Sequence, residues 1–120
     1  MREPVSGGTP AGPYTPGIIA CGRQLFVSGQ GPLRDGAVVE GTIAEQTRLT
    51  LENVGVVLRN AGASFADVAR VGVFLEDLDD FAAMNAVYME FFDEPRPART
   101  TVGARLMGIR VEIDCVAFLR

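Results

Sequence analysis

The strongest constraint on the fold is a pair of strand-like segments with apolar residues on both faces. In residues 110–119 the side chains alternate between two faces, and Val116 and Phe118 share the second face with acidic residues. Residues 68–75 are rich in β-branched side chains and are predicted to form a central strand. A strand that is apolar on both sides needs cover on both sides.

A long helix is predicted between these strands. Thr42 and Glu45 have the spacing of a capping box, in which each side chain satisfies a backbone N–H at the start of a helix. Apolar residues follow at spacings of three and four as far as Ala61, and they form one stripe that faces a core. Gly62 then supplies a left-handed stop.

A second helix is predicted after the acidic residues 76–80. Negative charge at this point favours the positive end of a helix dipole. The run lacks the turn glycine and the closing glutamate of a calcium loop, so we interpret it as a helix cap and predict no metal site. The apolar stripe of this helix consists of Phe81, Met84, Tyr88 and Phe91.

The start of the chain predicts an arm and several short strands. Residues 1–14 are rich in Gly and Pro and lack the apolar core of a secretory signal, so we expect an extended arm. Residues 17–20 and 25–28 are short apolar runs that predict a hairpin. Asp35-Gly36 marks a further turn before a third strand.

The order of these elements favours a single α+β domain over residues 1–120, with two helices packed on one face of a mixed β-sheet. The other face has no cover within the chain, so we expect it to be buried against further copies of the chain. No apolar run approaches the length of a membrane span. The lack of a secretory signal predicts a cytoplasmic location.

The charged residues narrow the possible partners. Lys and Arg number 11 against 15 Asp and Glu, and the chain has no histidine. This acidic balance disfavours nucleic acid, since sequence-independent affinity for it depends on clustered basic residues. Cys21 and Cys115 lie far apart without a CxxC motif, which predicts two small buried thiols and no zinc site.

Arg99 is the strongest candidate for a ligand contact, because it lies at the start of a predicted strand in a chain without lysine or histidine. A guanidinium presents a planar fork of N–H donors that matches a carboxylate. Asp114 shares a face with apolar neighbours, where a carboxylate is costly to ionise unless it has a partner or a role. From the residues alone, a solvated arginine and a structural ion pair remain open.

Several motifs occur in one order along the chain. They are GPY at 12–14, FVSGQGP at 26–32, QT and LEN in the first helix, VFLEDLDDF at 73–81 with Asn85 and Tyr88, PARTTV at 97–102, and VEID at 111–114. In this order and spacing they resemble the Rid family of reactive-intermediate (enamine/imine) deaminases, also called the YjgF family. The resemblance spans about residues 12–119.

The resemblance implies a chorismate-mutase-like α+β fold that assembles as a homotrimer, with ligand sites in the clefts between subunits. It also implies hydrolysis of 2-imino acids to 2-keto acids and ammonia, without a cofactor. Arg99 is then expected to hold the substrate carboxylate. Asp114, which takes the place of a glutamate in active members, is expected to position the attacking water.

The positions that the resemblance implies for substrate binding are Tyr14, Ser28, Gly29, Asn85 and Thr101. Because Asp is shorter than Glu, two alternatives stay open: a trimeric small-carboxylate-binding or regulatory protein without turnover, and a pathway-specific deaminase of a larger imine of the aminomuconate type. Ribonuclease or translation-inhibitor activity, which has been attributed to some members of the family, is disfavoured by the acidic balance.

Overall fold

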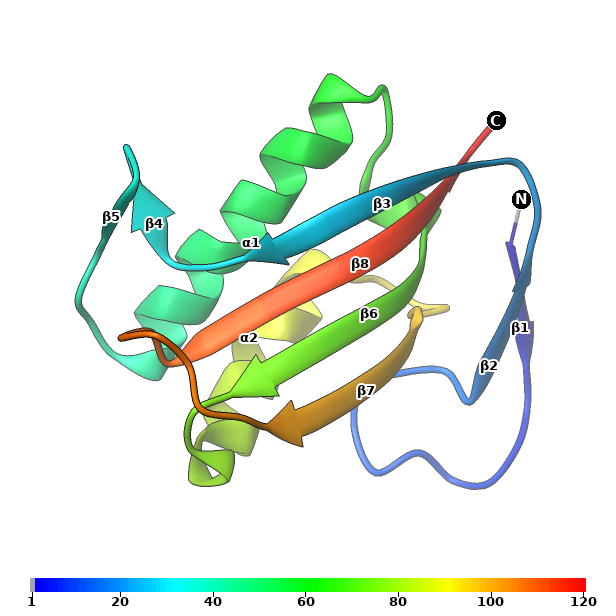
Figure 1. The fold of residues 1–120 in the computed structure, drawn as a ribbon. Helices are drawn as coiled ribbons and strands as arrows, with labels where there is room; N and C mark the ends of the chain where they lie inside the picture. Colours follow the sequence, from blue (N-terminus) through cyan, green and yellow to red (C-terminus); the bar gives the residue numbers. More distant parts are fainter. Residues whose placement is uncertain (1) are drawn as a thin grey trace.

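The computed structural model describes residues 2–120, and within them the central element is a four-stranded mixed sheet (Figure 1). The strand order is β3–β8–β6–β7. β6 (Val68–Leu75) and β7 (Ala98–Gly103) are parallel, whereas β8 (Val111–Leu119) runs antiparallel to both β6 and β3 (Arg23–Gln30). The interior position of β6 confirms the prediction of a central strand.

Within the described residues, two α-helices pack on one face of this sheet and leave the other face open (Figure 1). α1 (Ile43–Asn60) begins with the predicted capping box. Thr42 Oγ1 accepts a hydrogen bond from the Glu45 N–H at 3.1 Å, and the Glu45 carboxylate accepts one from the Thr42 N–H at 2.8 Å. α1 ends before Gly62, whose φ of 78° lies in the left-handed region that glycine tolerates. α2 (Phe81–Phe91) is the second helix, and neither helix is long and apolar enough to cross a membrane.

The acidic run after β6 caps a short 3₁₀ turn rather than α2 itself. The Asp77 carboxylate accepts a hydrogen bond from the Asp79 N–H at 2.9 Å, at the start of η2 (Leu78–Asp80). Asp80 comes directly before α2, but its side chain makes no capping hydrogen bond within the described part of the chain. The run therefore contributes negative charge near the start of α2, while its hydrogen bond stabilises the preceding turn. A second 3₁₀ turn, η1 (Phe65–Asp67), leads into β6.

The start of the chain differs from the predicted arm and hairpin. β1 (Arg2–Val5) pairs antiparallel with β2 (Gly17–Ala20), and among the described residues these strands form a ribbon of their own beside the sheet (Figure 1). The predicted hairpin between β2 and β3 is therefore wrong. Gly22, with φ of 128°, turns the chain between them so that β3 pairs with β8 instead. Met1, the first residue of the predicted arm, lies outside the described residues.

The predicted turn at Asp35-Gly36 joins a small hairpin. β4 (Leu33–Arg34) pairs antiparallel with β5 (Ala37–Val38). Both turn residues have positive φ, 52° and 79°, as a tight turn between antiparallel strands requires. The Asn53 amide of α1 donates a hydrogen bond to a carbonyl of β4 at 2.9 Å, which holds the hairpin against the helix.

The hydrophobic core lies between the helices and the sheet. In the α2 stripe, Met84 and Tyr88 are fully buried as predicted, whereas Phe81 and Phe91 at its ends are half-buried. The Tyr88 ring stacks on the Phe92 ring with centroids 4.5 Å apart. Other fully buried side chains come from the inner faces of β6 and β8 and from α1: Leu51, Val54, Leu58, Val71, Val73, Val111, Ile113 and Ala117.

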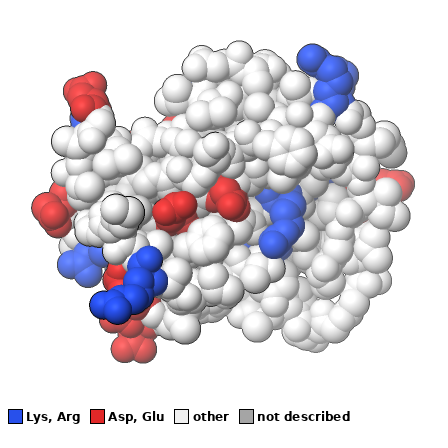
Figure 2. Space-filling view, viewed as in Figure 1, with Lys and Arg blue, Asp and Glu red and all other residues white. Residues whose placement is uncertain are grey.

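The open face of the sheet carries charged as well as apolar side chains. Figure 2 shows acidic side chains side by side near the middle of this face, with a basic side chain next to them and uncharged residues around. By the alternation of β8, the acidic residues on this face are Glu112 and Asp114, and the apolar residues beside them are Val116 and Phe118. On the edge strand β3, the Phe26 side chain is 70% exposed. Such a face is a candidate for contact with further copies of the chain.

We expect the wild-type chain to form an oligomer through this face, and Phe26→Asp to prevent it. A charge at the centre of an apolar contact must be desolvated, which opposes association. Light scattering coupled to size-exclusion chromatography should give the mass of about three chains for the wild type and of one chain for the variant.

Val56→Asp provides the control for this experiment. Val56 is 45% exposed on α1, on the helical side of the molecule, so its substitution should leave the mass unchanged. A wild-type mass near one chain, or an unchanged mass for Phe26→Asp, would contradict the role of the open face.

The two cysteines differ in environment. Cys115 is buried as predicted, but Cys21 is exposed in the turn between β2 and β3, which corrects the prediction of two buried thiols. Burial, together with the charge of Asp114, raises the pKa of the Cys115 thiol to about 12. The thiolate is the reactive form, and it is therefore suppressed in the folded protein below that pH.

We expect a Cys21→Ser variant to resist an aromatic disulfide reagent at about pH 8 until the protein is unfolded, since an unfolded cysteine has a pKa of about 8.5. Absorbance of the released thiolate, recorded with and without urea, measures this. Rapid stoichiometric reaction of the folded variant would show that Cys115 is accessible.

Candidate functional site

Arg99 lies on the edge strand β7, and its side chain points to the same face of the sheet as the helices. Its cross-strand partner on β6 is Val71, a fully buried core residue. Only 8% of Arg99 is exposed. Because β7 is an edge strand, the guanidinium reaches the space between α2 and the N-terminal segment instead of the centre of the core.

Aromatic rings surround the Arg99 guanidinium. Its central carbon lies 4.8 Å from the ring centroid of Tyr88 and 5.6 Å from those of Tyr14 and Phe81, within the range of cation–π contacts. Arg99 Nη1 donates a hydrogen bond to Asn85 Oδ1 at 2.8 Å. Burial lowers the pKa of Arg99, while Tyr88 and Tyr14 act in the opposite direction. Because the ordinary pKa of arginine lies far above neutral, the Arg99 guanidinium stays charged in spite of this lowering.

The other nitrogens of this guanidinium are buried. Within residues 2–120, Arg99 Nε and Nη2 make no hydrogen bond of normal geometry, although the Tyr88 hydroxyl contributes a looser polar interaction with Arg99. The nearby Thr101 hydroxyl also makes no hydrogen bond within these residues. An unsatisfied buried donor costs about 1–3 kcal/mol, and more when it is charged. A carboxylate presents the pair of acceptor oxygens that such a fork of donors matches. The arrangement is thus suited to a small carboxylic acid.

A pocket of about 320 Å³ opens beside the guanidinium. Its lining residues are Ala11, Tyr14, Phe81, Arg99, Thr100 and Thr101. The rings and the alanine supply an apolar wall, and the arginine and the threonines supply polar groups. This combination is typical of sites for small ligands that carry one charged end.

The structure brings four of the predicted site residues together. Tyr14, Arg99 and Thr101 line the pocket, and Asn85 lies behind the guanidinium. The Asn85 carbonyl oxygen accepts a hydrogen bond from Arg99, and the role of Asn85 as a substrate contact stays a prediction. This bond orients the guanidinium.

The other predicted residues lie elsewhere in the same chain. The ladder between β3 and β8 passes from Val27–Cys115 to Gln30–Ile113, so Ser28 and Gly29 form a bulge opposite Asp114. A bulge leaves a residue out of the ladder and is common near functional sites. The Asp114 side chain lies over Gly72 on the open face. Within one chain, Arg99 and Asp114 are therefore on opposite faces of the sheet.

Glu112 is a candidate that the sequence analysis missed. Its carboxylate occupies the space next to Gly29 where a side chain on that glycine would lie. The alternation of β8 places Glu112 and Asp114 on the same face, and this signal is present in the sequence. The bulge decides which carboxylate lies beside Gly29, and the bulge depends on the tertiary pairing of β3.

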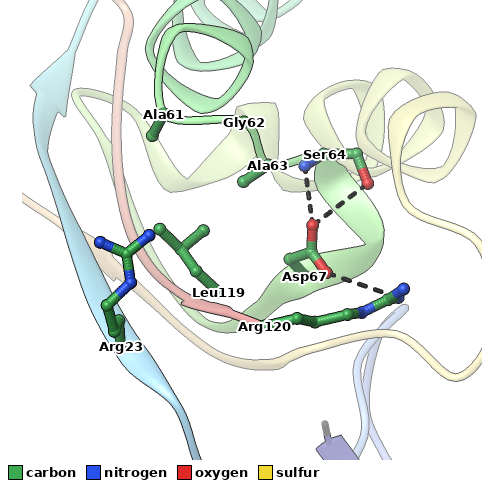
Figure 3. Close-up of a pocket in the computed structure, with 8 residues that line it drawn as sticks. All are labelled: Arg23, Ala61, Gly62, Ala63, Ser64, Asp67, Leu119 and Arg120. Carbon is green, nitrogen blue, oxygen red and sulfur yellow. Dashed lines mark hydrogen bonds and ion pairs between the residues drawn. The ribbon is translucent and has the colours of Figure 1, made fainter.

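A different pocket, of about 350 Å³, lies where the end of β8 meets the loop after α1 (Figure 3). Its acidic residue is used locally: the Asp67 carboxylate accepts a hydrogen bond from the Ser64 N–H at 2.9 Å and lies 3.9 Å from the Arg120 guanidinium. Of the described residues that line it, none belongs to the predicted site. Residues 2–120 also contain no cluster of three or more His, Cys, Asp or Glu that could hold a metal ion.

The fold and the pocket define a class of α+β protein with a buried arginine at the sheet edge. The family model described as Endoribonuclease L-PSP matches residues 6–119. The solved structure of YyfB from Yersinia pestis, a protein of unknown function of the conserved Rid family, has a TM-score of 0.86 at 27% identity over 98% of each chain. The chain therefore belongs to the Endoribonuclease L-PSP family, which is the YjgF/Rid family.

Relatives within this family carry different names. The mitochondrial protein mmf2 of Schizosaccharomyces pombe is 50% identical over 111 residues, which cover 88% of this chain and 87% of that protein. A 2-iminobutanoate/2-iminopropanoate deaminase of Capra hircus is 36% identical over 110 residues, which cover 88% of this chain and 80% of that protein. These comparisons confirm the resemblance on which the family prediction depends.

We expect Asn85→Ala to destabilise the protein by about 1–3 kcal/mol, because it removes the acceptor of a buried charged donor. Urea unfolding measures the free energy of unfolding. Asn60→Ala, at the exposed end of α1, is the matched control and should have an effect within about 0.5 kcal/mol. Equal effects of the two substitutions would show that Asn85 does not hold Arg99 in place.

Proposed function

We propose that this protein hydrolyses reactive 2-imino and enamine acids to 2-keto acids and ammonia. The observation that carries the proposal is the buried Arg99 guanidinium, whose Nε and Nη2 make no hydrogen bond of normal geometry within the described residues and lie beside a small, mostly apolar pocket. The name of the Capra hircus relative, a 2-iminobutanoate/2-iminopropanoate deaminase, supports this substrate class.

The complete site is proposed to form between copies of the chain in a homotrimer. A ligand held by Arg99 is on the helical side of the sheet, whereas Asp114 and Glu112 are on the open face. The carboxylates of the same chain are therefore separated from the ligand by the sheet. A second copy that packs its open face near the edge strand β7 would supply them, together with the bulge at Ser28 and Gly29.

The proposed reaction needs an oriented water and a proton acceptor. The water oxygen bonds to the iminium carbon as the C=N π electrons move to nitrogen, and a carboxylate accepts the water proton. Return of this proton to nitrogen allows the C–N bond to break. The C=O bond forms as the hydroxyl proton passes to the same carboxylate, and the departing ammonia takes up this proton as ammonium. Arg99 orients the substrate through its carboxylate, which contributes by proximity and charge placement.

Asp114 is the carboxylate that the family resemblance assigns to the water. Glu112 is a second candidate, because its longer side chain lies beside Gly29, one of the proposed substrate contacts. Both carboxylates are on the same face, so isosteric amides at each position separate their roles. The alternative function, small-carboxylate binding without turnover, predicts that neither amide changes a rate.

We expect an imine generated in situ by an amino-acid oxidase to be hydrolysed faster in the presence of the wild-type protein. Arg99→Ala should lower kcat/KM at least about 100-fold, since it removes the charge that holds the substrate. Glu112→Gln and Asp114→Asn are compared with each other. Whichever of them removes the carboxylate that positions the water should lower kcat by about 10²–10⁴-fold. Release of ammonia and of the 2-keto acid measures all of these.

Glu90→Gln is the control for this series, because Glu90 lies on α2 and pairs with Arg48 away from the pocket. Binding of a 2-keto acid without any rate enhancement would support the binding protein instead. A panel that includes a larger imine of the aminomuconate type tests the third alternative. The cytoplasmic location and the lack of a nucleic-acid partner stay predictions, and the mmf2 relative is named as mitochondrial.

A further inference from the structure

The N-terminal segment covers the Arg99 guanidinium. We call residues 10–15 the strap. Within it, the Tyr14 N–H donates a hydrogen bond to the Gly12 carbonyl at 2.9 Å, and the Ala11 N–H donates one to the Tyr14 hydroxyl at 3.1 Å. These bonds give the strap a compact conformation, with the Tyr14 ring over the guanidinium.

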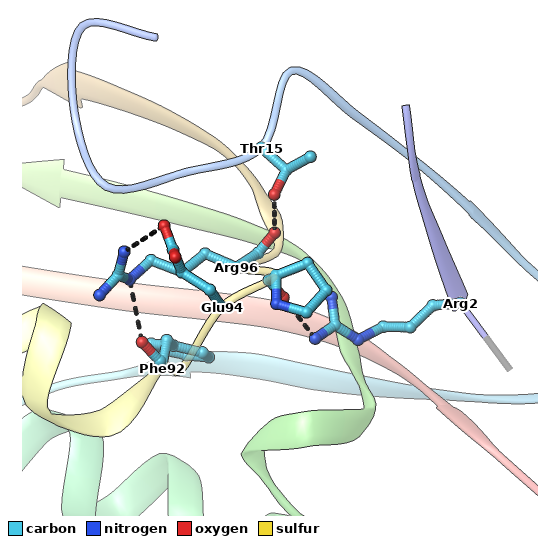
Figure 4. A network of polar contacts seen from close by, with 6 residues as sticks. Arg2, Thr15, Phe92, Glu94 and Arg96 are labelled. Carbon is cyan, nitrogen blue, oxygen red and sulfur yellow. Dashed lines mark hydrogen bonds and ion pairs between the residues drawn. The ribbon is translucent and has the colours of Figure 1, made fainter. Parts of the chain in front are cut away.

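The strap is attached to the body of the protein at its C-terminal end. The Thr15 N–H donates a hydrogen bond to the Pro97 carbonyl at 3.2 Å, and the Thr15 hydroxyl donates one to the Arg96 carbonyl. Figure 4 shows this contact within a network of polar groups that precedes β7. The Arg96 Nε also donates to the Phe92 carbonyl at 3.0 Å, which connects the same segment to the end of α2.

The start of the chain is attached to the same region. The Arg2 side chain donates hydrogen bonds from Nε to the Ala66 carbonyl at 2.7 Å and from Nη2 to the Pro95 carbonyl at 2.6 Å. Figure 4 shows the Arg2 side chain beside the network that precedes β7. Arg2 belongs to β1, and β1 pairs with β2, which follows the strap in the chain. The chain is therefore fixed before the strap by β1, at the end of the strap by Thr15 and after it by β2.

Gly12 is the point where the strap approaches the guanidinium. A side-chain carbon on Gly12 would lie 3.1 Å from Arg99 Nη2, 3.5 Å from the Tyr14 ring and 3.6 Å from the Phe81 ring. The two ring distances are ordinary contacts, whereas 3.1 Å is closer than most contacts of a side-chain carbon, so the guanidinium must shift by a few tenths of an ångström. Gly12 does not have the positive φ that favours glycine, so the constraint at this position is space.

We infer that Gly12 is a positioning residue that sets the orientation of the Arg99 guanidinium for a carboxylate ligand. The inference rests on the proposed function, because it concerns the same anion site. Nη2 is one of the donors without a hydrogen bond of normal geometry in the described residues, and it is the atom that a methyl group on Gly12 would displace. Bidentate binding of a carboxylate tolerates little displacement of the fork.

The experiment uses the full chain and 2-ketobutyrate, a stable 2-keto acid, as the probe. Isothermal titration or ligand-observed NMR gives its Kd for the wild type, for Gly12→Ala and for Gly8→Ala. Gly8 is the matched control, because it lies in the same N-terminal segment and a side chain there would meet nothing within 4 Å. We expect Gly12→Ala to raise Kd about tenfold and Gly8→Ala to leave it within about twofold.

A double-mutant cycle tests whether Gly12 acts through Arg99. Lysine has no atom equivalent to Nη2, so in an Arg99→Lys background the further change Gly12→Ala should alter Kd by less than about twofold. An equal, roughly tenfold loss in both backgrounds would overturn the inference, because Gly12 would then act independently of the guanidinium fork.

Kinetics separate positioning from a general structural effect. Gly12→Ala should raise KM for the imine about tenfold and leave kcat within about twofold, since the proposed water-positioning carboxylates are not disturbed. Its melting temperature should match that of Gly8→Ala. A fall in kcat together with a lowered melting temperature would overturn the inference in favour of a structural role.

The outcomes for the two proposals are distinct. If the wild type binds 2-ketobutyrate and Gly12→Ala weakens this binding, but no imine is hydrolysed, the inference holds and the proposed hydrolysis fails. If the wild type hydrolyses the imine and Gly12→Ala has an unchanged Kd, only the inference fails. If the wild type does not bind 2-ketobutyrate, the inference fails together with the anion-holding role of Arg99.

Discussion

The buried charge of Arg99 is the feature on which the arrangement of the site depends. A guanidinium that is removed from water costs several kcal/mol unless its surroundings compensate for it. Here the faces of Tyr14, Phe81 and Tyr88 and the carbonyl oxygen of Asn85 provide part of this compensation. The remaining donors are buried beside the pocket, where an anion would interact with them more strongly than in water.

The sheet separates this charge from the carboxylates of the same chain. Alternate residues of a strand point to opposite faces, so Arg99 joins the core side while Glu112 and Asp114 join the open face. This separation keeps the opposite charges from pairing within one chain. The proposed reaction then requires a second copy of the chain to supply the carboxylates. The surface proposed to contact that copy includes the exposed Phe26, which lies next to the bulge at Ser28 and Gly29.

Local sequence signals predicted much of the fold correctly. The capping box of Thr42 and Glu45 and the turn at Asp35-Gly36 depend on residues close together in the chain, and both form as predicted. The pairing of β2 was predicted wrongly, since the choice between β1 and β3 as its partner depends on long-range contacts that periodicity does not encode. The prediction that Cys21 is buried was wrong as well, because burial also depends on contacts between segments far apart in the chain.

By itself the sequence determined the helices, the central strand and the family, because these follow from residue spacing and from motifs along the chain. The chemistry of a single side chain also made Arg99 the proposed anion contact. Only the tertiary structure decided that Asn85 orients Arg99, that Gly12 lies against Nη2, and that Glu112 lies beside Gly29. These contacts join segments far apart in the chain. Their geometry depends on strand register and on the path of the strap, which no local pattern specifies.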